Sequence, residues 1–124
     1  MATVACPFAE NEDPFDENLV KAFRNQGGRA ADFSRNPVHQ DRFGAIQGHL
    51  QRLRHLGLYA YRPDFLQLFT TLAPTPLEQA ERLEQLRALE HGYPIAVAVV
   101  AWAYHGIDTP EQYQAFVEHM REIP

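Results

Sequence analysis

A period of two runs through Arg54-His55-Leu56-Gly57-Leu58-Tyr59-Ala60-Tyr61-Arg62. Such alternation is typical of a strand, and it predicts one over residues 54–61. One face of this strand is apolar, and the other carries ring side chains: His55, Tyr59 and Tyr61. Gly57 lies within the second row, and a glycine inside a strand often marks the close approach of a ligand or another backbone. The pattern has two interpretations, the wall of a binding site or a partly exposed edge strand with ordinary tyrosines.

Two strands, a helix and a loop are predicted before this stretch. The strands cover residues 1–6 and 30–34. Between them Asp13-Pro14 is typical of a helix start, and the predicted helix ends at Gly27-Gly28. One face of that helix would carry Phe15, Leu19 and Phe23. Residues 36–49 predict a loop in which Asp41 and Arg42 are solvated.

Two helices are predicted immediately after it. Pro63 begins a short one, with Phe65, Leu66 and Phe69 as its apolar anchors. Thr75-Pro76-Leu77-Glu78 is a capping box with proline at the first helical position. It predicts a helix from residue 77 to residue 90.

The end of the chain predicts one more strand and one more helix. The apolar run 95–100 is typical of a strand buried on both faces, and a turn is expected at His105-Gly106. Thr109-Pro110-Glu111-Gln112 repeats the capping pattern and predicts a helix over 110–121. Its inner face would carry Tyr113, Phe116, Val117 and Met120.

Helices that alternate with strands imply crossover connections. The predicted fold class is therefore α/β, with a mixed sheet and flanking helices. The 124 residues fit one domain that spans residues 1–124.

Composition excludes several classes of function. The net charge of −5 argues against a nucleic-acid partner, because domains that bind nucleic acid are usually basic. No stretch approaches the roughly 20 apolar residues of a membrane span, and the first nine residues do not form a signal peptide. Cys6 is the only cysteine and cannot form an internal disulfide, which favours a reducing compartment, the cytoplasm.

A few polar residues are candidates for chemistry. Asp108 follows a buried strand and precedes the Thr109 cap, so it is placed either to bind a hard cation such as Mg²⁺ or only to favour the helix N-terminus. Arg35 is either a carboxylate-binding residue or a surface arginine. Glu84 and Gln85 border the apolar face of the 77–90 helix, as site residues or as a solvated edge. The six histidines contain no i, i+4 pair, so a histidine-built zinc site is not expected.

Five motifs in order resemble the carboxyl-terminal half of the 3-deoxy-manno-octulosonate cytidylyltransferase (CMP-Kdo synthetase) family. They are Phe33-Ser34-Arg35, residues 54–62, Thr75-Pro76-Leu77-Glu78, Leu83-Glu84-Gln85-Leu86-Arg87, and Gly106-Ile107-Asp108-Thr109-Pro110-Glu111. The resemblance implies a partial nucleotidyltransferase-like fold. It implies a dimerising Mg²⁺ enzyme that transfers CMP from CTP to the sugar acid Kdo for lipopolysaccharide or capsule synthesis.

Carried over position by position, the family's sugar-acid contacts fall on Arg35, His55, Tyr59, Glu84 and Gln85, and a Mg²⁺ ligand falls on Asp108. The family's nucleotide-binding half, with its other metal aspartate, has no counterpart here, and residues 38–41 depart from the family pattern. Three hypotheses follow: an enzyme half that needs a partner chain supplying the CTP site, a non-catalytic sugar-acid binder, or a self-associating structural module. In each, contact with a second copy or a partner chain is expected.

Overall fold

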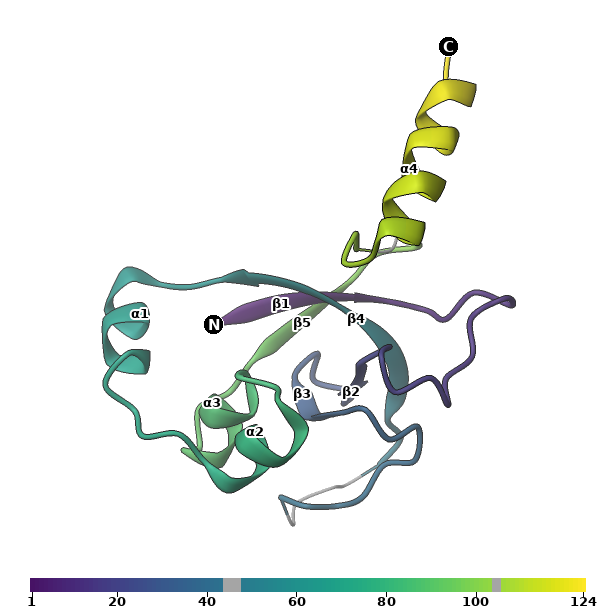
Figure 1. The fold of residues 1–124 in the computed structure, drawn as a ribbon. Coiled ribbons are helices and arrows are strands. Elements are labelled where there is room, and N and C mark those ends of the chain that lie inside the picture. The colour runs from purple at the N-terminus through teal and green to yellow at the C-terminus, as the bar shows by residue number, and fades with distance from the viewer. Residues whose placement is uncertain (44–47, 104–105) are drawn as a thin grey trace.

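The computed structural model describes residues 1–43, 48–103 and 106–124 (Figure 1). Within these residues the strands are β1 (Ala2–Cys6), β2 (Lys21–Arg24), β3 (Ala30–Ser34), β4 (Gln51–Ala60) and β5 (Ala96–Val99). The helices are α1 (Pro63–Phe69), α2 (Pro76–Glu81), α3 (Leu86–Glu90) and α4 (Pro110–Glu122). No helix in the described ranges is both long enough and apolar enough to span a bilayer.

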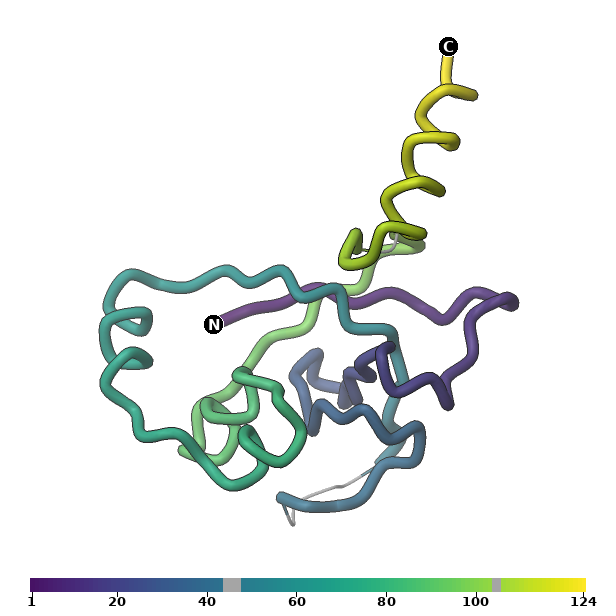
Figure 2. Tube along the Cα trace, in the orientation of Figure 1, coloured from purple at the N-terminus to yellow at the C-terminus, as the bar shows by residue number. Residues whose placement is uncertain are grey.

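The strands form one mixed sheet in the order β3-β2-β4-β1-β5. β1 and β5 are parallel, and the other neighbours are antiparallel. The outer strands approach each other, because Arg29 bridges Ala96 and the Ala30 N–H donates to the Ile95 carbonyl at 2.9 Å. The sheet therefore curls, as the chain trace in Figure 2 shows. The α/β class with a mixed sheet and flanking helices is confirmed.

The core lies between the concave side of the sheet and the short helices. Ala22 of β2 stands opposite both Phe33 and Leu53, and all three side chains are buried. Leu86 of α3 and Phe69 of α1 close this core. Apolar side chains from neighbouring strands thus meet at one level, which fixes the register of the sheet.

β4 carries an irregularity at the predicted glycine. Thr3 pairs with Tyr59 and Ala5 pairs with His55, so residues 56–58 stand opposite Val4 alone. Gly57 has φ +73°, a left-handed conformation that glycine adopts without cost. This is a β-bulge, which bends a strand and re-aims the side chains beside it.

The helix predicted between Pro14 and Gly27 is wrong. Residues 14–19 form turns, and β2 follows. Lys21, Ala22 and Phe23 are consecutive and all buried, which suits a strand paired on both edges but not an amphipathic helix. Pairing with strands distant in sequence outweighs the local four-residue spacing of the aromatic residues.

The helix predicted over 77–90 is two helices. Arg82 ends α2 with φ 57°, and this left-handed residue turns the chain before α3 begins. The turn lets Leu83 and Leu86 both reach the core. The Glu78 carboxylate accepts from the Thr75 N–H at 3.1 Å, so the predicted helix start is confirmed.

Two expectations about burial near the C-terminus are also wrong. β5 buries Val97, but Ala96 and Ala98 are exposed because no described element covers that face of the sheet. α4 has nearly the predicted bounds, but it extends away from the sheet (Figure 1), and Tyr113, Phe116 and Met120 are exposed. Residues 44–47 of the predicted loop and His105 of the predicted turn lie outside the described residues.

We expect Gly57→Ala to lower the free energy of unfolding by about 1 kcal/mol. A Cβ at Gly57 would meet no atom within 4 Å, so the loss comes from backbone strain at φ +73° and not from a clash. Chemical denaturation measures it, with Gly106→Ala as the control because Gly106 has no positive φ. Equal losses in the two variants would contradict the bulge.

Candidate functional site

Arg35, His55 and Asp108 line one cavity of about 1070 Å³. Its walls come from the segment after β1, the middle of β4, and the start of α4. The three residues are separated by 20 and 53 positions in the sequence, and the fold brings them to one concave surface. Concave surfaces with a few convergent polar groups are where small ligands bind.

Two backbone carbonyls orient the Arg35 guanidinium. Its Nε donates to the Glu81 carbonyl at 3.0 Å, and one Nη donates to the Glu17 carbonyl at 2.9 Å. Carbonyls fix the direction of the guanidinium without cancelling its positive charge. Arg35 is therefore prepared to bind an anion.

Lys21 lies behind Arg35 and was not singled out from the sequence. Its side chain is fully buried, and its ammonium donates to the carbonyls of Arg35 (2.6 Å) and Asp16 (2.9 Å). Burial lowers the pKa of this ammonium. Lys21 ties the end of β3 to the 13–19 segment, and the only sequence signal for it is a lysine within the apolar run 19–23.

Arg42 forms an ion-pair network with two carboxylates, so its predicted solvation is wrong. Its guanidinium contacts Asp32 and Glu81, each at 2.8 Å, and donates to the Phe33 carbonyl. Asp32 is 1% exposed, so the pair is largely shielded from water. Arg42 and Ser34 both donate to the Glu81 carboxylate, and these bonds hold Glu81 in place so that its backbone carbonyl can accept from Arg35.

Arg54 connects the cavity's two sides and was likewise missed as a site residue. Its Nε lies 3.0 Å from the Glu12 carboxylate, as an ion pair without hydrogen-bond alignment, and one Nη donates to the Ala103 carbonyl at 2.6 Å. Ala103 begins the connection toward Asp108. Arg54 thereby holds the 7–19 segment and the approach to α4 against β4.

His55 is held on the inner side of the bulge. Its Nε2 lies 2.8 Å from Thr3 Oγ1, and its ring packs edge-on against Phe33 at a centroid distance of 4.9 Å. Burial lowers the pKa of His55 to about 4. The imidazole is therefore neutral at neutral pH.

The predicted row of rings is continuous. The His55 and Tyr59 centroids are 5.6 Å apart, and Tyr59, Tyr61 and Phe65 follow at 6.1 and 6.5 Å. Burial, with the charge of Glu84 nearby, raises the pKa of Tyr59, so its hydroxyl stays protonated. Glu84 is exposed and Gln85 is buried at the start of α3. Tyr59, Glu84 and Gln85 do not line the cavity with Arg35.

Asp108 precedes a well-formed cap. Thr109 Oγ1 accepts from the Gln112 N–H, and Gln112 Oε1 accepts from the N–H groups of Thr109 and Asp108. The predicted capping box is confirmed, and it leaves the Asp108 carboxylate exposed at the cavity. One exposed carboxylate fits Mg²⁺ when phosphates and water supply the other ligands. No group of three or more potential ligands is found among the described residues.

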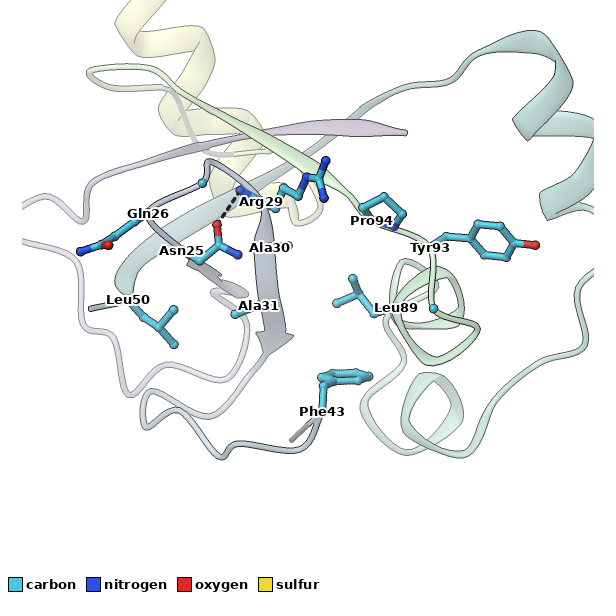
Figure 3. Close-up of a pocket in the computed structure, with 12 residues that line it drawn as sticks. Asn25, Gln26, Arg29, Ala30, Ala31, Phe43, Leu50, Leu89, Tyr93 and Pro94 are labelled. Atoms are coloured by element: carbon cyan, nitrogen blue, oxygen red, sulfur yellow. Dashed lines mark hydrogen bonds between the residues drawn. The ribbon is translucent and has the colours of Figure 1, made fainter. Parts of the chain in front are cut away.

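A second cavity of about 670 Å³ lies beside β3 (Figure 3). Asn25 and Gln26 stand on one side of β3, and Leu89 and Tyr93 stand on the other. Arg29 also lines this cavity. The predicted site residues do not line it.

Comparisons with known proteins match most of this chain. A family model described as cytidylyltransferase matches residues 1–97. 3-Deoxy-manno-octulosonate cytidylyltransferase of Xanthomonas campestris is 49% identical over 121 residues, covering 92% of this chain and 48% of the relative. The protein of the same name from Syntrophobacter fumaroxidans is 48% identical, covering 94% of this chain and 46% of the relative.

A solved structure agrees with these sequences. CMP:2-keto-3-deoxy-manno-octonic acid synthetase complexed with CTP has a TM-score of 0.82 and 34% identity, covering 98% of this chain and 48% of that chain. The chain spans about half the length of the curated relatives it matches. The resemblance seen in the sequence is confirmed, and the roles of the individual residues stay predictions.

We expect Arg42→Met to lower the free energy of unfolding by about 2–4 kcal/mol, because it leaves the buried Asp32 carboxylate without its cation. Arg52→Met is the matched control, since Arg52 is exposed and its guanidinium donates to the Pro37 carbonyl. Urea denaturation compares the two. Losses of similar size would show that the Arg42 network does not stabilise this region.

His55 should make stability depend on acidity. Its pKa is about 4 when folded against 6.5 when unfolded, so the unfolded state binds the extra proton between these values. The contribution of His55 to the free energy of unfolding is complete above pH 6.5. It falls by about 2–3 kcal/mol as the pH falls from 7 to 4.5. Chemical denaturation at pH 7 and pH 4.5 measures this drop in the wild type and in His55→Gln. The drop should be larger by that amount in the wild type, and equal drops would contradict a buried neutral imidazole.

Proposed function

The chain belongs to the cytidylyltransferase family, and we propose that it supplies the sugar-acid side of a CMP-Kdo synthetase. In the proposed reaction the anomeric hydroxyl of Kdo attacks the α-phosphorus of CTP and loses its proton to solvent, a new P–O bond forms, the bond between the α-phosphorus and the bridging oxygen breaks, and pyrophosphate leaves. The observation that carries the proposal is the single cavity lined by Arg35, His55 and Asp108.

Each predicted residue has chemistry suited to this substrate. The Arg35 fork matches a carboxylate in two-point geometry. The neutral imidazole of His55 and the protonated hydroxyl of Tyr59 suit sugar hydroxyls, and Glu84 and Gln85 would extend these contacts from the α2–α3 connection. Asp108 would hold Mg²⁺, which when bound neutralises charge on phosphate oxygens.

The nucleotide side would come from a counterpart of the relatives' other half. This chain spans about half their length, so binding of CTP and transfer of CMP are proposed only when that half is present. Large apolar side chains are exposed here, including Leu58 at 65% and Trp102 at 67%. They favour contact with a partner chain or a second copy. A nucleotide-dependent reaction and a lone cysteine fit the cytoplasm.

A second candidate function is sugar-acid binding without catalysis. It is favoured because the proposed sugar contacts lie in this half of the family's length. Pyrophosphate release from CTP, Kdo and Mg²⁺ separates the two when it is measured with this chain alone and with a counterpart of the relatives' other half added. Release only in the mixture supports the enzyme half, and no release in the mixture by a chain that binds Kdo supports the binder. Release by this chain alone that Asp108→Ala abolishes would contradict the need for a second half.

We expect Kdo to bind this chain in calorimetry, and Arg35→Gln to weaken it about 10- to 100-fold through loss of a charge-assisted contact. Arg29→Gln is the matched control, because Arg29 is an exposed arginine of the second cavity. Denaturation of both variants confirms that they fold. Equal affinity of Arg35→Gln and wild type would contradict the assignment of Arg35.

A further inference from the structure

The Thr3 hydroxyl makes two short contacts but has only one proton to donate. Its Oγ1 lies 2.7 Å from the Leu58 carbonyl and 2.8 Å from His55 Nε2, and the residue is 2% exposed. A carbonyl oxygen can only accept, so the hydroxyl proton of Thr3 must point at Leu58. Thr3 Oγ1 then has only lone pairs to offer His55.

The carbonyl that takes this proton lies in the bulge. Residues 56–58 stand opposite one residue of β1, which displaces them from regular pairing. Thr3 donates a hydrogen bond to the carbonyl of Leu58, one of these displaced residues. The direction of the Thr3 hydroxyl is therefore set by the backbone.

The tautomer of His55 follows. Since Thr3 Oγ1 accepts, Nε2 must carry the imidazole proton, and in a neutral imidazole Nδ1 is then a bare lone pair. Among the described residues, no hydrogen bond to Nδ1 is found. The Phe33 and Tyr59 rings both pack against the imidazole and restrict its rotation.

We infer that Thr3 is a positioning residue, which fixes His55 as its Nε2–H tautomer and leaves Nδ1 to accept a hydrogen bond from a ligand hydroxyl. The ligand part rests on the proposed function; the tautomer does not. The partner is a hydroxyl because a bare imidazole nitrogen offers nothing to a carboxylate, which Arg35 suits instead.

Nitrogen-15 NMR of the wild-type imidazole at neutral pH tests the tautomer without any ligand. We expect the His55 resonances to show a protonated Nε2 and an unprotonated Nδ1. A protonated Nδ1 in the wild-type chain would overturn the inference, whatever the variants do.

Two variants then test whether Thr3 is the cause. Thr3→Val keeps the shape and removes the acceptor, so His55 should become a mixture of tautomers and Kdo should bind about 5- to 10-fold more weakly. Thr3→Ser keeps the hydroxyl and should restore both. A purely structural Thr3 predicts instead that Thr3→Val loses stability while His55 keeps its tautomer, which would overturn the inference.

The outcomes separate the two proposals. A wild-type chain with the Nε2–H tautomer that binds no Kdo supports the positioning of His55 by Thr3 and refutes the proposed function. A chain that binds Kdo with equal affinity in wild type and Thr3→Val refutes the role of Nδ1 and leaves the proposed function intact.

Discussion

The pairing of β4 with both β2 and β1 is the interaction on which the rest of the structure depends. β4 is the longest strand and the centre of the sheet, so it joins the β3–β2 pair to the β1–β5 pair. Its first half pairs with β2 and its second half with β1. Within the second half Gly57 allows a bulge, with His55 before it and Tyr59 after it. Arg54 and His55 line the cavity. The strand that assembles the sheet thus also builds a wall of the cavity.

Cations around the cavity fall into two groups by their acceptors. Arg42 is surrounded by Asp32 and Glu81 and acts as a structural ion pair. Arg35 and Lys21 are held by backbone carbonyls, and of these two only Arg35 lines the cavity, because Lys21 is fully buried behind it. In a chain with a net charge of −5, a guanidinium that is oriented by carbonyls at a concave surface is a favourable place for an anion to bind.

Local signals predicted the parts of the fold that local interactions determine. The Thr109 cap, the start at Thr75, β1, β3 and the central strand were all found from neighbouring residues. β2 was missed because its burial comes from partners in β3 and β4, and the break at Arg82 was missed because nothing in its immediate sequence demands a left-handed residue. The motifs identified Arg35, His55 and Asp108, but Lys21 and Thr3 act through distant carbonyls, and only the register of the strands reveals them.

Chemical-shift mapping with Kdo tests whether the cavity lined by Arg35, His55 and Asp108 receives a sugar acid. We predict that backbone and side-chain signals of Arg35, His55 and Tyr59 shift together and saturate. Signals of the second cavity, such as those of Asn25 and Arg29, should stay in place. Shifts confined to the second cavity, or none at saturating Kdo, would contradict sugar-acid binding at Arg35 and His55.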